Sequence, residues 1–169
     1  MAQDVSKRMK LFMVLAALFA LSYTAFLFLP YFRVFNSSTQ QLSYSITGFS
    51  VAFGKSTNSE HIIGSNIMII AEIAGMVGGF ATLLFVLLYL FRKNDTPWMY
   101  FILGLSIPCG ALAIASIFFA GPIYQNINKI VNKTLVFSPF FYITATLTII
   151  SFLMNGFILF SASLLNRRR

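Results

Sequence analysis

Four long apolar runs dominate the chain, and each ends at charged or turn-forming residues. They cover about residues 11–32, 67–91, 98–120 and 140–165. A helix needs about 20 apolar residues to cross a hydrocarbon core about 30 Å thick, and every run reaches that length. The only charged residue inside a run is Glu72. The pattern predicts an all-α membrane protein, with residues 1–169 forming one domain built as a bundle of four transmembrane helices.

The first run can also be interpreted as a cleavable signal peptide, because basic residues precede it. Its apolar stretch, however, continues to Phe32, past the usual length of about 7–15 residues for such peptides. No small-residue cleavage site with a polar sequel follows it. A retained first helix is therefore the favoured interpretation.

Two connections, about residues 33–66 and 121–139, are long enough to carry structure of their own. In the first, apolar and small polar residues alternate on both sides of Thr47-Gly48. A two-residue turn there would pair two strands in a β-hairpin with one apolar face. That face would comprise Leu42, Tyr44, Ile46, Phe49, Val51 and Phe53. The weak point is Thr47, since a β-branched residue resists the positive φ of a type I′ turn.

An isolated hairpin is only marginally stable, so its apolar face must rest on the bundle or on a partner. The polar segments that flank it are interpreted as solvated connectors; the alternative is an exposed strand edge that recruits another protein. In the second connection, Ile123, Ile127, Ile130 and Thr134 follow at helical spacing. This spacing predicts a short helix, either lying on the outer membrane surface or capping the bundle.

Composition and charge support the membrane interpretation. The chain is 58% hydrophobic and 9% charged, whereas soluble domains are about a quarter charged. Eight basic residues fall at the two termini and in the connection between the second and third runs, and four fall in the two long connections. Cytoplasmic loops carry the excess of Lys and Arg. The sequence thus predicts a multi-pass protein of the cell membrane with both termini in the cytoplasm, and no nucleic-acid partner.

Few residues are available for catalysis or metal binding. The chain has one cysteine, Cys109, one histidine, His61, and four carboxylates, so it predicts no intrachain disulfide, no metal site and no cofactor. The carboxylates lie in different segments. Membrane hydrolases require paired or clustered acidic, basic or nucleophilic groups. We therefore expect a protein that is not an enzyme.

The intramembrane carboxylate Glu72 is the strongest candidate for a functional residue, because ionisable groups are expensive in hydrocarbon. Ala71, Gly75 and Gly79 are small residues near it that allow close helix packing. At matching depth, the expected hydrogen-bond partners are Ser116 and either Thr144 or Thr148. A polar stripe on the fourth run completes the candidate site: Thr144, Thr148, Ser151 and Asn155.

Two interpretations of these polar residues remain open. In the first, which we favour, they form interhelical hydrogen bonds that stabilise the bundle. In the second, Glu72 takes part in proton-linked transport, and the stripe lines a polar path. The absence of a second charge within the apolar runs favours the structural role.

In topology the chain resembles claudin-type four-span proteins, which have a strand-forming first outer loop. It departs from them because residues 34–66 contain neither cysteine nor tryptophan. The segment Thr47-Gly48-Phe49-Ser50-Val51-Ala52-Phe53-Gly54, followed by a polar stretch and a second span, more closely resembles small uncharacterised bacterial four-helix integral membrane proteins. That resemblance implies no known activity.

The expected function is thus binding of a partner or organisation of the cell envelope, without catalysis. The expected partners are the lipid bilayer, another membrane or envelope protein, and a second copy of the chain in a homo-oligomer. The alternative is a small proton-linked or solute transporter or channel subunit that uses Glu72.

Overall fold

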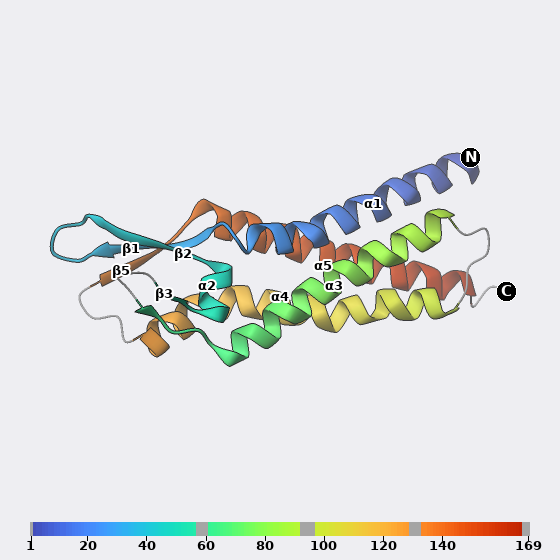
Figure 1. Ribbon diagram of the computed structural model, residues 1–169. Coiled ribbons are helices and arrows are strands. Elements are labelled where there is room, and N and C mark those ends of the chain that lie inside the picture. Colours follow the sequence, from blue (N-terminus) through green and yellow to red (C-terminus); the bar gives the residue numbers. More distant parts are fainter. Residues whose placement is uncertain (1, 57–60, 92–96, 129–132, 167–169) are drawn as a thin grey trace.

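The computed structural model describes residues 2–56, 61–91, 97–128 and 133–166. Four long helices run roughly side by side and a small sheet extends from one end of them (Figure 1). The helices are α1 (Ala2–Phe26), α3 (Asn66–Phe91), α4 (Pro97–Asn128) and α5 (Pro139–Asn166). The start of α1 and the end of α5 both lie at the other end of the bundle. We call these the sheet end and the terminal end.

Each long helix contains a segment long and apolar enough to cross a membrane: Met9–Phe26, Asn66–Phe91, Met99–Asn128 and Pro139–Ser161. Large apolar side chains also cover the outside of the helices, as in Ile70, Phe80, Phe101 and Phe157, which are 56–71% exposed. Contiguous exposed apolar surface of this kind marks contact with a membrane or another protein. The fold is that of a multi-pass membrane protein.

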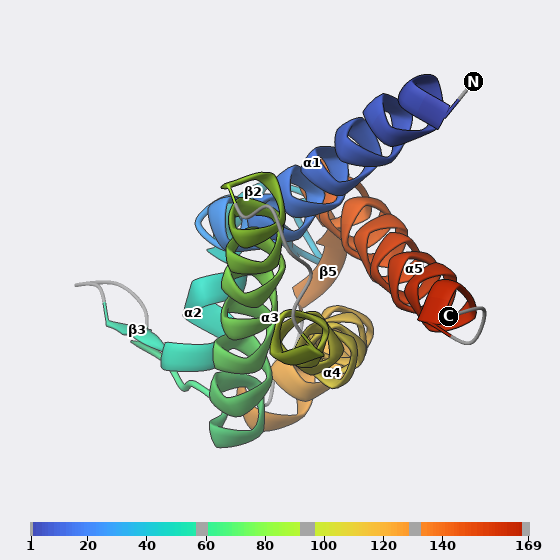
Figure 2. The ribbon, with the colours of Figure 1, turned by 90° about the vertical axis from the view of Figure 1, so that its right-hand side faces the viewer.

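The four helices pack as a closed ring in the order α1, α3, α4, α5, with α5 returning to α1. Figure 2 views the ring from the terminal end, where α1 and α5 diverge and α3 and α4 stay close. The packing between α3 and α4 is the most extensive. The interior of the bundle therefore has walls from all four helices.

The predicted second and fourth spans agree with α3 and α5 to within one residue at each end. The first span was predicted too long, because α1 ends at Phe26 and Pro30 begins a strand. The third was predicted too short, since α4 continues through Pro122 to Asn128.

Packing against the sheet explains why α4 continues through Pro122. A proline inside a helix removes one backbone hydrogen bond and costs about 3 kcal/mol. The part of α4 around Pro122 is buried under the sheet: Tyr124 is 1% exposed, and a Cβ at Gly121 would lie 3.3 Å from the ring of Phe137. This burial offsets the lost bond and keeps the last turns of α4 helical.

Three antiparallel strands form the sheet, in the order β2-β1-β5: β1 (Pro30–Asn36), β2 (Leu42–Thr47) and β5 (Lys133–Phe137). Phe32 pairs with Ile46 on one side and with Phe137 on the other, and these side chains face the bundle. A second, two-stranded sheet joins β3 (Lys55–Ser56) to β4 (His61–Ile62). The hairpin of this fold is β1–β2.

The hairpin predicted around Thr47-Gly48 is therefore wrong. β2 ends at Thr47, and residues 48–53 form the short helix α2 (Gly48–Phe53). Thr47 has an extended backbone, with φ −83° and ψ 158°, and its Oγ1 accepts a hydrogen bond from the Ser50 backbone N–H. Threonine is a good N-cap and a poor type I′ turn residue, so this position begins a helix.

The short helix predicted in the second long connection is also not present as such. Ile123 and Ile127 belong to the last turns of α4, and Thr134 lies in β5. Ile130 is outside the described residues. Instead of a helix, residues 133–137 form a strand that pairs with β1 along its whole length, and this pairing satisfies its backbone groups.

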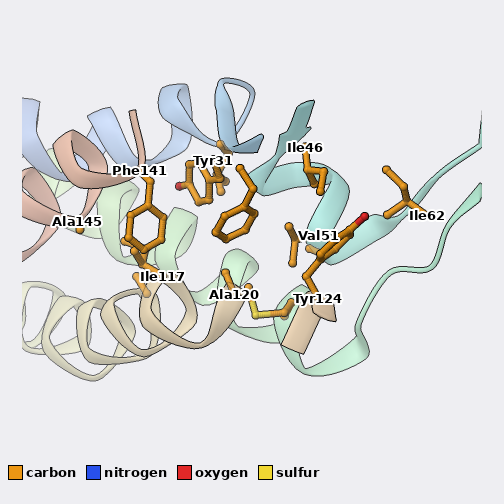
Figure 3. Packing of buried hydrophobic residues seen from close by; sticks show 14 of the residues in the cluster. Tyr31, Ile46, Val51, Ile62, Ile117, Ala120, Tyr124, Phe141 and Ala145 are labelled. Carbon is orange, nitrogen blue, oxygen red and sulfur yellow. The ribbon is translucent and has the colours of Figure 1, made fainter. Parts of the chain in front are cut away.

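Two apolar clusters fill the bundle. The one near the sheet end joins the sheet, α2 and the helices around Phe32, Ile117, Tyr124 and Phe141 (Figure 3). Tyr31 belongs to it, and burial raises the pKa of its hydroxyl, so that this residue stays neutral. The other cluster lies toward the terminal end and centres on Phe85, Leu103 and Ile158.

Candidate intramembrane polar site

Polar side chains from all four long helices are buried in the interior of the bundle. We call them the polar layer: Tyr23, Glu72, Thr82, Ser106, Ser116, Thr148, Ser151 and Asn155, all at most 6% exposed. Polar groups in such a setting must find partners within the protein, because hydrocarbon offers none. The hydrogen bonds between side chains of this layer fall into two groups.

The first group centres on Tyr23 of α1. Its hydroxyl donates to Glu72 Oε2 at 2.7 Å and lies 3.1 Å from Ser116 Oγ. One tyrosine thus joins α3 to α4 through the interior of the ring. Sequence reasoning placed Ser116 near Glu72, and the structure brings both residues to the same tyrosine, which that reasoning missed.

The protons of this group can be counted. The Ser116 hydroxyl lies 2.8 Å from the carbonyl oxygen of Ala113 and can donate to it. The Tyr23 hydroxyl donates its proton to the Glu72 carboxylate. The Ser116 hydroxyl can instead donate to the Tyr23 hydroxyl, and all side-chain contacts of this group then have a proton with Glu72 ionised. With a neutral Glu72 carboxyl that donates to Tyr23, the tyrosine proton is free for Ser116. The group accommodates both states of the carboxyl.

The second group centres on Asn155 of α5. Its Nδ2 donates to Thr82 Oγ1 at 2.9 Å and to Ser106 Oγ at 3.0 Å. The two hydroxyls in turn donate to carbonyl oxygens of their own helices, those of Gly78 and Leu103. Asn155 therefore joins α3, α4 and α5. Its Oδ1 is buried and has no hydrogen-bond partner.

A small cavity lies between the two groups. All four helices line it, and both Tyr23 and Asn155 contribute to its wall, together with Thr82, Ser106, Thr148 and Ser151. The space open to the centre of a water molecule is about 20 Å³. Glycine and alanine residues of α1, α3 and α4 supply much of the remaining wall, so the cavity is a gap that small side chains leave.

Two of the other three residues of the predicted stripe, Thr144 and Thr148, form their hydrogen bonds within α5. Both donate to carbonyl oxygens one turn earlier on this helix, which is a common arrangement for threonine within a helix. Neither of these hydroxyls donates to Glu72, contrary to the prediction. Ser151 instead crosses to α1 and donates to the carbonyl oxygen of Ala16 at 3.1 Å.

The small residues of α3 allow it to pack closely against α1. A Cβ at Gly75 would collide with the ring of Tyr23, and one at Gly79 would lie 3.0 Å from the carbonyl oxygen of Ala20. Both glycines therefore face α1. Ala71 is buried on the same helix. This close approach brings the Tyr23 hydroxyl within reach of Glu72.

The six residues predicted for the hairpin face do not share one surface. Tyr44 faces the bundle, with its hydroxyl 3.1 Å from that of Tyr124, and Ile46 and Val51 are buried. Leu42 is 52% exposed. Phe49 and Phe53 are partly exposed on α2, where their rings stack, and Phe28 stacks on Phe49.

Within the described residues, no group of three or more His, Cys, Asp or Glu side chains could hold a metal ion. Comparison of the chain with protein-family models, curated proteins and solved structures finds no match. The resemblance to bacterial four-helix membrane proteins thus stays a prediction, and function has to be argued from the molecule itself.

Sequence reasoning did not find Tyr23, Thr82 and Ser106. A tyrosine inside an apolar span was a usable signal, because a buried hydroxyl requires a partner. Thr82 follows Gly75 and Gly79 on α3, near the packing face that these glycines indicated. For Ser106 we find no comparable signal in the sequence.

Proposed function

We propose that this chain is a non-catalytic integral protein of the cell membrane that binds another membrane or envelope protein through the outward face of its sheet. The observation that carries the proposal is the composition of that face. By register it comprises the side chains that point away from the bundle: Arg33, Phe35, Leu42, Ser45, Thr134 and Val136. Leu42 and Val136 are 52% and 48% exposed.

Several features make this face suited to a protein partner. Apolar residues surround one cation, Arg33, which is exposed. Within the described residues, β2 and β5 each pair only with β1, so each has one edge open to a further strand. The expected partner segment is apolar with an acidic side chain opposite Arg33.

The orientation belongs to the same proposal. Basic residues gather at the two termini and in the connection between α3 and α4, and the helix ends next to them form the terminal end. The positive-inside rule then puts the terminal end in the cytoplasm and the sheet outside. Protease accessibility of tags at either terminus in sealed cells tests this sidedness: digestion of either tag from outside contradicts it.

Photo-crosslinking in native membranes tests the partner. A photoreactive amino acid at position 42 or 136 is expected to give a discrete adduct, which mass spectrometry identifies as another protein or as a second copy. Phe80 of α3, 57% exposed on the membrane-spanning surface, is the matched control position. Absence of protein adducts at 42 and 136 above the level at 80 refutes a partner on this face.

Proton-linked transport of a small solute is the second candidate, favoured by the buried Glu72 and by a cavity that all four helices line. Reconstitution into proteoliposomes separates the two. A proton or solute flux that Glu72→Gln abolishes supports transport; flux equal to that of empty liposomes contradicts it. Neither result depends on the crosslinking outcome.

A further inference from the structure

The cavity in the polar layer contains an unsatisfied hydrogen-bonding position. Asn155 is 3% exposed and lines the cavity, and its Oδ1 has no partner. Leaving a buried polar atom without a partner costs about 1–3 kcal/mol. The bilayer offers no solvent that could reach around the helices to satisfy it.

Neither neighbouring hydroxyl can donate to Asn155 Oδ1 without giving up the hydrogen bond that it already donates. The protons of Thr82 and Ser106 are already donated to the carbonyl oxygens of Gly78 and Leu103. Turning the Asn155 amide over would not help, since Nδ2 would then be the unpartnered atom. In both orientations one polar atom of the amide needs a partner from outside the protein.

We propose that the cavity is a binding site for ordered water, which donates to Asn155 Oδ1 and also contacts the Tyr23 hydroxyl. The available space of about 20 Å³ matches the requirement of about 10–15 Å³ for one water molecule. Hydroxyl oxygens of Thr82, Ser106, Thr148 and Ser151 in the wall supply the further partners that a buried water requires.

A small cation fits the site less well. Hard cations take six or more oxygen ligands and favour carboxylates, and no carboxylate lines the cavity. Water can both donate and accept, so it satisfies the amide in either orientation. The bound water connects the Tyr23 and Asn155 groups, and the polar layer becomes one hydrogen-bonded unit from Glu72 to Ser106.

Radiolytic labelling of the full-length chain in lipid nanodiscs tests the proposal. A short X-ray pulse generates hydroxyl radicals from water where it is bound, and mass spectrometry measures oxidation of adjacent side chains. Tyr23 is 1% exposed and lines the cavity, whereas Phe85 is 0% exposed within an apolar cluster. After correction for intrinsic reactivity, Tyr23 should be oxidised several-fold more than Phe85. Equal, low labelling of both overturns the proposal.

Variants provide a second comparison. Asn155→Leu should reduce Tyr23 oxidation to the level of Phe85, because the apolar isostere removes the group that holds the water. Thr148→Val should reduce it in part, with Thr146→Val as the matched control: both threonines donate to a carbonyl oxygen one turn earlier, but Thr146 is exposed and does not line the cavity. Equal effects of the two threonine variants contradict the proposal.

A salt exchange distinguishes water from sodium. If a sodium ion occupies the site, replacing sodium chloride by choline chloride lets water enter, and Tyr23 labelling rises; that result overturns the proposal. Unchanged labelling supports it. The salt exchange and the comparison of Tyr23 with Phe85 both use the wild-type chain. The proposal can therefore be tested even if Asn155→Leu does not fold.

Discussion

Removing the Tyr23 hydroxyl should destabilise the bundle more than removing any other single hydroxyl of the polar layer. In Tyr23→Phe the Glu72 side chain, 1% exposed, loses the hydroxyl that lies 2.7 Å from it. A buried group left without its partner costs about 1–3 kcal/mol. The contact with Ser116 is lost as well, and interhelical hydrogen bonds in membranes average about 0.6 kcal/mol. We expect a total loss of about 1.6–3.6 kcal/mol.

Two further variants give the expected order. Ser116→Ala removes one contact of Tyr23 and leaves Glu72 paired, so it should cost about 0.6 kcal/mol, the average for such bonds. Glu72→Gln should cost less than Tyr23→Phe, because a neutral amide can donate to the tyrosine as a neutral carboxyl does. Tyr142→Phe is the control, since Tyr142 lies 58% exposed on α5 and its loss should change little.

The free energy of unfolding in lipid bicelles, measured by titration with a denaturing detergent, is a suitable assay. The expected order of losses is Tyr23→Phe above both Glu72→Gln and Ser116→Ala, with Tyr142→Phe near zero. A Tyr23→Phe loss no larger than that of Ser116→Ala refutes the central role of the tyrosine. If Glu72→Gln costs more than Tyr23→Phe, the neutral carboxyl is the wrong protonation state.

Two predictions concern other positions. Gly78→Ala should destabilise the chain, because the new Cβ would lie 2.8 Å from Cβ of Cys109; Gly104→Ala meets nothing within 4 Å and should stabilise α4 by about 0.5–1 kcal/mol. Thermal unfolding in detergent compares the two, and equal effects contradict the packing argument. Thr47→Ala should cost about 1 kcal/mol through loss of the N-cap and speed amide hydrogen exchange in α2; unchanged exchange there contradicts the capping role.

The sequence predicted the long helices well because the membrane itself determines their length. A run of about 20 apolar residues has few alternatives in hydrocarbon, so α3 and α5 were found nearly to the residue. The ends of α1 and α4 depended instead on contacts made at the sheet end of the bundle. The packing of Tyr124 against Phe32 involves residues far apart in the sequence, which local pattern does not reveal.

The error at Gly48–Phe53 has a local cause. Alternation over six residues cannot by itself exclude a short helix, and here Thr47 caps one by bonding to Ser50. Choosing between a turn and a cap at Thr47 depended on φ, and the preference of threonine for negative φ pointed to the cap. The predicted strand pairing also required a two-residue turn, whereas β1 and β2 are joined by residues 37–41.

For the polar site, the sequence predicted the important carboxylate but not its partner. Glu72 is recognisable because it is a lone charge in an apolar run. Depth matching predicted Ser116 as its hydrogen-bond partner, whereas in the structure each of the two residues contacts Tyr23. Tyr23 lies 49 positions from Glu72 along the chain, and only the packing of α1 onto Gly75 brings them together. Long-range packing of this kind is not encoded in a periodicity.

The continuity of α4 has a mechanical consequence. Its 32 residues extend over about 48 Å at 1.5 Å per residue, longer than a hydrocarbon core of about 30 Å. One continuous helix therefore reaches from the terminal end of the bundle to the strands of the sheet, with no loop between them to absorb motion. A tilt of about 10° about one end of this helix would displace the other end by about 8 Å. A force applied to the strands is therefore transmitted along α4 to the polar layer.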